Sequence, residues 1–172
     1  MATEVLLINR ADIMRLTPLS GNVDEDKILP HVLTSQDIHL QPIIGTKLMQ
    51  KLKDLITAGT IGDAGNEAYE TLLYTYVTPT LVYYVMWDFI PFMQYEIANG
   101  GVFQHNSENS ATPTFEEVDS IIQRFKDKAG FYGSRMTDYL CDNNSSFPEL
   151  NESTSGAELN DEGQDAFKGW VI

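Results

Sequence analysis

Two segments of the chain show apolar positions spaced by three and four residues, the pattern of amphipathic helices. In "TKLMQKLKDLITAG" the apolar residues 48, 52, 55 and 56 share one face, the lysines lie off it, and Gly59 follows. Residues 115–142 repeat the pattern over a longer stretch, after a capping box formed by Thr114 and Glu117. A glycine after the last periodic residue is a common helix stop. We therefore predict helices over about 46–58 and 115–142.

The most apolar stretch runs from about residue 66 to 98. Between Leu72 and Met93 its only formal charge is Asp88, so a membrane-spanning helix is one interpretation. Three threonines, two prolines and a central carboxylate suit hydrocarbon poorly, whereas the aromatic content suits a helix surrounded by others. We predict a central core helix, kinked or broken near its prolines, and no membrane span. Its core, shared with residues 115–142, is expected to contain Leu72, Leu73, Tyr76, Leu81, Val85, Phe89, Ile122, Phe125 and Met136.

The first forty residues give weaker helical signals. Asn9 stands where an N-cap is expected, and "RADIMRLTP" allows one or two turns before Pro18. Acidic residues then open a second apolar stripe, which Pro30 should kink or delay. The fold class predicted from these patterns is all-α: a helical bundle with a long central apolar helix, an inter-helix loop and an extended C-terminal arm.

The junction "NGGVFQHNSENSATP" (residues 99–113) admits two interpretations. It is either a phosphate-binding loop with a catalytic histidine or a crossover between two helices. A phosphate loop needs its glycines to lead into a helix, usually with a lysine close behind, and no basic residue lies between Gly100 and Pro113. We predict that the glycines stop the preceding helix and that a connecting loop follows. Phe103 and His105 are its candidate partner-binding residues, although a loop phenylalanine can equally fold back on its own core.

Composition narrows the class of protein. The 172 residues are enough for one domain with its own core. The formal net charge is −14 and the pI is near 4.4, which argues against sequence-independent binding of nucleic acid, because that affinity comes from Lys and Arg. The single Cys141 excludes an intramolecular disulfide, and no secretory signal is visible, so we expect a protein made in a cytoplasm.

No pattern of catalytic or metal-binding residues is found. His31 and His39, with Asp37 nearby, lie about 80° and two turns apart on a helix and make a poor metal pair. Cys141 has no obvious base beside it and is interpreted as a small apolar filler. Asp88 is either a buried functional carboxylate or, more commonly, one that is paired or points along a solvated flank. We expect no enzyme, no cofactor and no metal.

The tail, residues 143–172, is expected to be an acidic extended arm separate from a helical domain of residues 1–142. Nothing between Asn151 and Asp165 has enough apolar side chain to bind a core. The chain then ends in "FKGWVI", whose large residues favour β-structure. This terminus either folds back on its own domain or anchors the arm to a neighbour. The candidate anchor residues are Phe167, Trp170, Val171 and Ile172.

The order and composition of several segments resemble the head–tail connector (adaptor, or ring) proteins of crAss-like and related Bacteroidetes tailed bacteriophages. The segments are "LLINRADIMRLTPLSGNVDEDKILPHVLTSQDIHLQPIIGTKLMQKL", "YVTPTLVYYVMWDFIPFMQYEIANGGVFQHNSENS" and "CDNNSSFPEL". The resemblance implies a virion structural subunit that forms a homo-oligomeric ring, twelve-fold by that resemblance, at the portal vertex. Its implied partners are the portal protein and neighbouring tail or ring proteins. Genome DNA would pass through without sequence-specific binding, and assembly would take place in the host cytoplasm.

Two other classes of function stay open at this point. One is a soluble helical protein-binding module with a disordered acidic tail that does not assemble into a ring. The other is an enzyme that uses Asp88, His105 and Glu108, which lack a recognisable arrangement of acid, base and nucleophile.

Overall fold

The computed structural model describes residues 4–19, 23–93, 95–98, 101–104 and 114–150, and for the two strands and Phe115 it describes the backbone only. It is an all-α helical bundle, as the sequence predicts, with one short β-hairpin added. The described elements are α1 (Arg10–Leu16), α2 (Glu25–Ser35), α3 (Gln41–Ile44), α4 (Thr46–Ala58), α5 (Glu67–Thr71), α6 (Thr78–Phe89), β1 (Tyr95–Ala98), β2 (Gly101–Gln104) and α7 (Phe115–Asp142).

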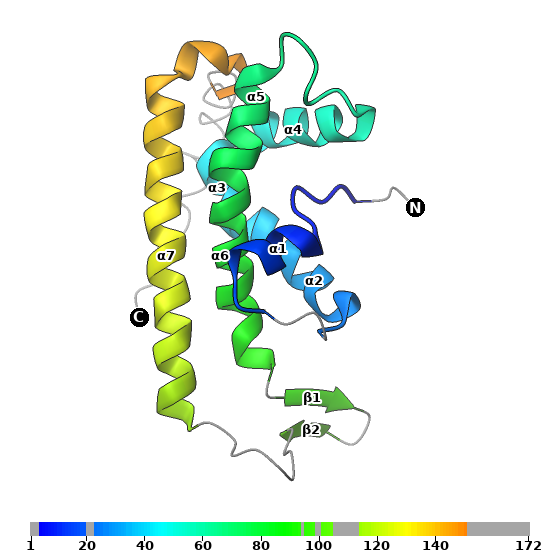
Figure 1. Ribbon diagram of the computed structural model, residues 1–172, viewed down its shortest axis with the longest axis vertical. Coiled ribbons are helices and arrows are strands. Elements are labelled where there is room, and N and C mark those ends of the chain that lie inside the picture. The colour runs from blue at the N-terminus through cyan, green and yellow to red at the C-terminus, as the bar shows by residue number, and fades with distance from the viewer. Residues whose placement is uncertain (1–3, 20–22, 94, 99–100, 105–113, 151–172) are drawn as a thin grey trace, which may run out of the picture.

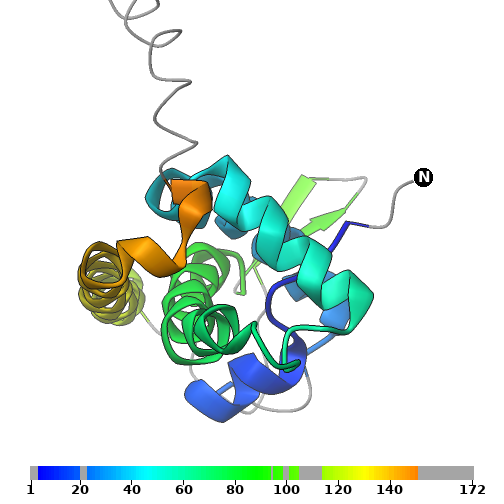
Figure 2. The same ribbon diagram turned by 90° about the horizontal axis from the view of Figure 1, so that it is seen from above.

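The bundle is built around two long antiparallel helical segments (Figure 1). One is the continuous run from α5 through α6, and the other is α7, which makes the largest interface with α6. α1 and α2 pack on α6 from the side away from α7, and α4 crosses that side near the α5 end (Figure 2). Of the nine predicted core residues, Tyr76 and Ile122 are partly buried and the other seven are buried. The core therefore lies along α6, which is covered by α7 on one side and by α1 and α2 on the other.

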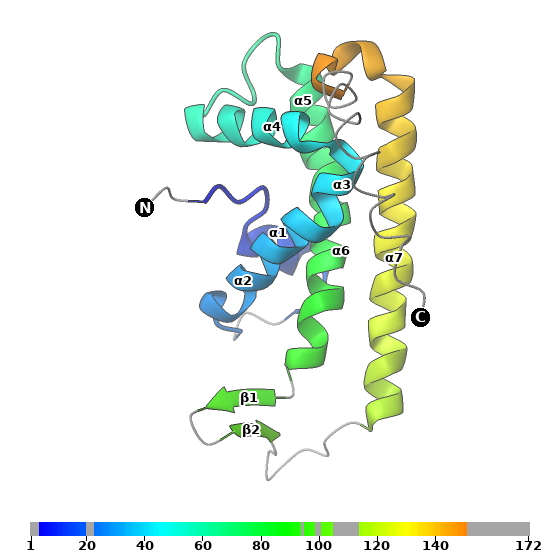
Figure 3. The same cartoon turned by 180° about the vertical axis from the view of Figure 1, so that it is seen from behind.

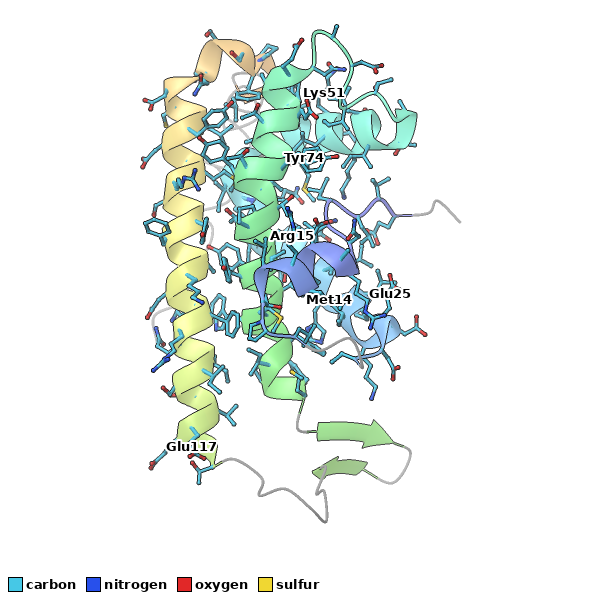
Figure 4. All side chains as sticks on the ribbon, in the orientation of Figure 1. Met14, Arg15, Glu25, Lys51, Tyr74 and Glu117 are labelled. Carbon is cyan, nitrogen blue, oxygen red and sulfur yellow. The ribbon has the colours of Figure 1, made fainter. Side chains whose placement is uncertain are left out.

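The predicted bounds of the helix at 46–58 and the predicted start of the long helix after Thr114 are confirmed. α4 ends at Gly59, which has φ +69° and so adopts the left-handed conformation that glycine permits. α7 begins with the predicted capping box: Glu117 N–H donates to the Thr114 side chain, and the Glu117 side chain accepts from Thr114 N–H. Glu117 thus marks the N-terminus of α7, at the same end of the bundle as the hairpin (Figure 4). Asn9 caps α1 in the same way with Asp12. α2 continues through Pro30.

Two of the prolines each follow a segment in which the helix widens from the α-helical to the π-helical hydrogen-bond pattern. Residues Gln36–Leu40, between α2 and α3, and Leu72–Val77, between α5 and α6, form π-helical segments. Each precedes a proline, Pro42 or Pro79, that cannot donate to the carbonyl four residues earlier. The Thr78 amide and hydroxyl instead both donate to the Leu73 carbonyl, the hydroxyl at 2.8 Å. The predicted break near the prolines is therefore a local change of pitch.

The central helix ends earlier than predicted. α6 stops at Phe89, a 3₁₀ turn covers Ile90–Phe92, and the chain then turns into β1 instead of continuing as helix to residue 98. Pro91 supplies the reason, because it has no amide hydrogen to continue the helical ladder. The predicted helix stop at residues 99–101 and the loop assigned to 102–104 are both wrong, since Gly101–Gln104 forms β2.

Residues beyond the predicted domain boundary belong to the helical body. A 3₁₀ turn covers Asn144–Ser146, the Phe147 side chain is fully buried, and Leu150 packs against the core. The predicted boundary at residue 142 had placed Phe147 in the arm. The body therefore extends at least to residue 150, and residues 151–172 lie outside the described part of the chain.

Candidate functional site

The hairpin lies where α6 ends and α7 begins, and it reaches away from α7 (Figure 3). β1 and β2 are antiparallel, with Tyr95 opposite Gln104 and Ala98 opposite Gly101. Against the rest of the described structure, the hairpin makes its main contact through β1 with the turn Ile90–Phe92. Beside that turn, Phe92 and Met93 expose 53% and 46% of their surface. Within the described residues, this end of the bundle therefore presents strand edges next to exposed apolar side chains.

The structure places only one of the six candidate partner-binding residues. Phe103 lies in β2 opposite Glu96, and nothing is described of its side chain. The remaining candidates lie outside the described residues: His105, Phe167, Trp170, Val171 and Ile172.

Asp88 is paired, which is one of the structural roles considered for it. The Ser35 hydroxyl donates to its Oδ2 at 2.8 Å, and His39 Nε2 lies 3.1 Å from the same oxygen. The His39 ring stacks on Tyr84 with centroids 4.3 Å apart. Serine, histidine and aspartate are also the groups of a hydrolytic triad, but that chemistry requires histidine between the other two. Here the carboxylate is in the middle, so the cluster joins α2 and the following π-helical segment to α6.

Replacing Asp88 by alanine is expected to lower the free energy of unfolding by about 2–3 kcal/mol, because the fully buried Ser35 hydroxyl loses its acceptor. Asp88→Asn keeps an acceptor oxygen and should cost about half as much. Urea unfolding followed by circular dichroism measures both. Equal losses for the two variants would show that keeping an acceptor oxygen for the Ser35 hydroxyl contributes little.

The other histidine of the pair is packed between aromatic rings. His31 lies with its ring centroid 5.3 Å from that of Phe89 and 5.4 Å from that of Phe92. Burial lowers the pKa of His31, and the Asp88 carboxylate opposes that shift. Asp37, which the sequence placed near both histidines, is exposed. Within the described residues, no group of three His, Cys, Asp or Glu side chains could hold a metal ion.

A buried glutamine holds the N-terminal segment. Gln36 is fully buried, its Oε1 accepts from Leu7 N–H at 2.7 Å, and its Nε2 donates to the Val5 carbonyl at 3.3 Å. The side-chain amide thus satisfies backbone groups of a segment that is neither helix nor strand. In this segment, the side chains of Leu7 and Ile8 are buried in the core.

Gln36→Met should keep the volume but leave the Leu7 amide without a partner, at a cost of about 1–3 kcal/mol. Hydrogen exchange at Leu7 should accelerate at least tenfold, while exchange in α7 follows only the global loss of stability. Gln36→Glu, which keeps an acceptor for Leu7, is the matched control. Unchanged protection of the Leu7 amide in Gln36→Met would show that this amide does not depend on a hydrogen bond to the Gln36 side chain.

The opposite end of the bundle anchors residues 144–150 (Figure 1). The Phe147 ring packs edge-on to Tyr69, with centroids 5.5 Å apart, and also contacts Tyr139. The Tyr69 hydroxyl donates to the Glu149 carboxylate at 3.0 Å. Burial, together with this carboxylate, raises the pKa of Tyr69 to about 12, so the phenol remains a donor at neutral pH. Lys51 lies on α4 and is labelled in Figure 4. Its Nζ is 5.6 Å from the centroid of the Tyr69 ring.

Several cations of this acidic chain lie over aromatic rings. On α7, Lys126 lies 5.5 Å from the Trp87 centroid, Lys128 5.3 Å from Tyr83, and Arg135 5.0 Å from Tyr76. Such contacts hold these charges against the α6–α7 interface. Cys141 is exposed and is not the apolar core residue that the sequence suggested. Within the described residues, no helix combines the length and apolar character that a membrane span requires.

Comparison with known proteins gives a family without an assigned activity. The model of DUF6712, described as a family of unknown function, matches residues 40–159. Because this match covers more than half of the chain, the protein belongs to that family. No curated protein and no solved structure matches the chain.

Proposed function

We propose that this protein is a virion structural subunit that forms a ring connecting the portal vertex of a tailed phage capsid to the tail. The observation that carries the proposal is the two-stranded hairpin at one end of the helical bundle. An isolated two-stranded hairpin is at best marginally stable in water, and its edges can pair with other strands. A neighbouring subunit or ring protein would supply the missing contacts. Repetition of one such contact between different surfaces closes a ring.

The charge of the chain is compatible with a passage for DNA. A net charge of −14 repels nucleic acid, and three cations of α7 are engaged with aromatic rings. A ring through which the genome moves benefits from a lumen that does not bind it. The genome would accordingly pass without sequence-specific contacts.

The resemblance to phage connector proteins supplies the rest of the proposal. It implies a twelve-fold homo-oligomer whose partners are the portal protein and the neighbouring tail or ring proteins. The protein would be assembled in the host cytoplasm and would then reside at the head–tail interface of the virion. It would have neither a catalytic role nor a cofactor.

Native mass spectrometry of the full chain, alone and mixed with the portal protein from the same genome, tests this function. The expected result is a ring of about twelve subunits, either free or on the portal. A ring-former can stay monomeric until it meets its template, so the mixture is the decisive sample. A chain that stays monomeric or dimeric with the portal present would favour the alternative, a helical protein-binding module that forms no ring.

Phe103→Ala is expected to weaken assembly at least fivefold while changing the melting temperature of the free subunit by no more than about 1 °C. The reason is its place in β2, on the hairpin rather than in the helical bundle. Sedimentation of the assembled fraction and thermal unfolding of the monomer measure the two effects. A large loss of monomer stability would instead place Phe103 in the core.

A further inference from the structure

We propose that the outer edge of β2 receives the C-terminal residues 167–172 of a neighbouring copy of the chain as a third strand. This inference rests on the proposed ring for the presence of a neighbouring copy. It goes further by naming the acceptor edge and the segment that occupies it.

The acceptor is defined by the register of the hairpin. In a hairpin with a two-residue connection, the closing pair, here Ala98 and Gly101, exchanges backbone hydrogen bonds, and the pattern alternates from there. The amides of Val102 and Gln104 therefore face away from β1. β1 contacts the turn Ile90–Phe92, whereas β2 lies farther from the helices (Figure 3). Among the described residues, the sheet has no third strand.

The surface at the root of the hairpin suits an apolar ligand. Phe92 and Met93, at the turn that leads into β1, are about half exposed. Residues 95–104 carry one formal charge, Glu96, in a chain with a net charge of −14. Strand addition takes affinity from backbone hydrogen bonds, and a buried aromatic anchor adds to it. This end thus offers both kinds of contact to a short segment.

The C-terminal segment has the matching chemistry. Its six residues, "FKGWVI", include four large residues that favour β-structure, and they are long enough to pair with a four-residue strand. Its one side-chain charge is Lys168, opposite in sign to Glu96. The preceding residues 151–165 carry five acidic side chains and no basic one. An acidic tether is repelled by the acidic body and so favours an extended reach over folding back.

Geometry favours a neighbour's hairpin over the chain's own. The arm leaves the body after Leu150, at the end opposite the hairpin, with α7 between them (Figure 1). The 28 residues of α7 span about 42 Å, and the sixteen residues 151–166 reach at most roughly 58 Å when fully extended. Pairing within one chain would require the tether to stretch over most of its full length, which lowers its effective concentration at the edge.

Photo-crosslinking in the full chain tests the inference. Unlabelled chain carrying Trp170→p-benzoylphenylalanine is mixed with ¹⁵N-labelled chain in the presence of the portal protein, irradiated and digested. We expect position 170 to crosslink to residues 92–104 of labelled copies. In a second sample, Val102→Pro in the labelled copy removes the outward amide and should lower the yield at least fivefold. Val102→Ala, which keeps the amide, should lower it less than twofold.

The outcomes separate this inference from the ring itself, whose mass is measured on the same samples. A ring without the crosslink, a crosslink confined to unlabelled chains, or a crosslink to the portal alone would overturn the inference and leave the ring standing. The crosslink in a dimer that forms no ring would support the arm contact and overturn the proposed function. Equal yields for Val102→Pro and Val102→Ala would show that the contact does not use the β2 edge.

Discussion

Replacing Phe147 by alanine is expected to destabilise the subunit by about 3–5 kcal/mol, the usual cost of truncating a fully buried phenylalanine. The ring has no exposed surface and makes edge-on contacts with Tyr69 and Tyr139. The expected fall in melting temperature is roughly 10 °C for a chain of this length. Thermal and urea unfolding, each followed by circular dichroism, measure the change.

Phe131→Ala is the matched control. Phe131 lies on α7 with 66% of its surface exposed, so the same substitution should change the free energy of unfolding by no more than about 0.5 kcal/mol. A Phe147→Ala variant as stable as Phe131→Ala would contradict the burial of residues 144–150. It would also move the start of the arm back towards residue 143.

Signals that lie within one turn of helix were sufficient to predict the helix boundaries. The Thr114 and Glu117 pair starts α7 and Gly59 ends α4, as expected from sequence. Each depends on hydrogen bonds between residues at most five apart, which the sequence displays directly. The apolar spacing likewise identified the core of α6 and α7, because burial on a helix follows its period.

The hairpin was not predicted because the residues at its turn are typical of two different structures. Asn99 and Gly100 form the dipeptide that two-residue hairpins prefer, but a glycine after a long apolar helix is also a common C-cap. Two observations could have decided the question: Pro91 ends a helical ladder, and the β-favouring residues Ile97 and Val102 flank the Asn-Gly pair symmetrically. The apolar character of residues 66–98 instead favoured a central helix.

The partners of polar side chains that lie far apart in the sequence could not be predicted. Asp88 meets His39 across 49 positions, and Gln36 meets Leu7 across 29. The sequence shows only that a lone charge inside an apolar stretch needs a partner, without indicating which one. Phe147 is similar: a single aromatic residue among polar neighbours has no periodicity, so composition alone assigned it to the tail.

Deletion of residues 166–172 should leave a folded, monodisperse subunit that no longer joins its partner. The last described residue that packs on the core is Leu150, and fifteen residues separate it from the start of the deletion. The melting temperature should therefore change by no more than about 2 °C. The assembled fraction with the portal protein should fall at least tenfold, because the deletion removes all four candidate anchor residues at the end of the arm.

Replacing residues 166–172 by an equally long Gly-Ser sequence controls for arm length, and it should fail to assemble in the same way. Lys168→Ala, which keeps all four apolar residues, should assemble within about twofold of the wild type. Normal assembly of the truncated chain would refute the arm, and loss of its cooperative unfolding would show that the terminus folds on its own domain. Phe147→Ala and the truncation thus act on opposite sides of Leu150. The first should lower the stability of the free subunit, and the second should remove assembly from a subunit that is still stable, because the residues that hold the arm to the body differ from those that bind the neighbour.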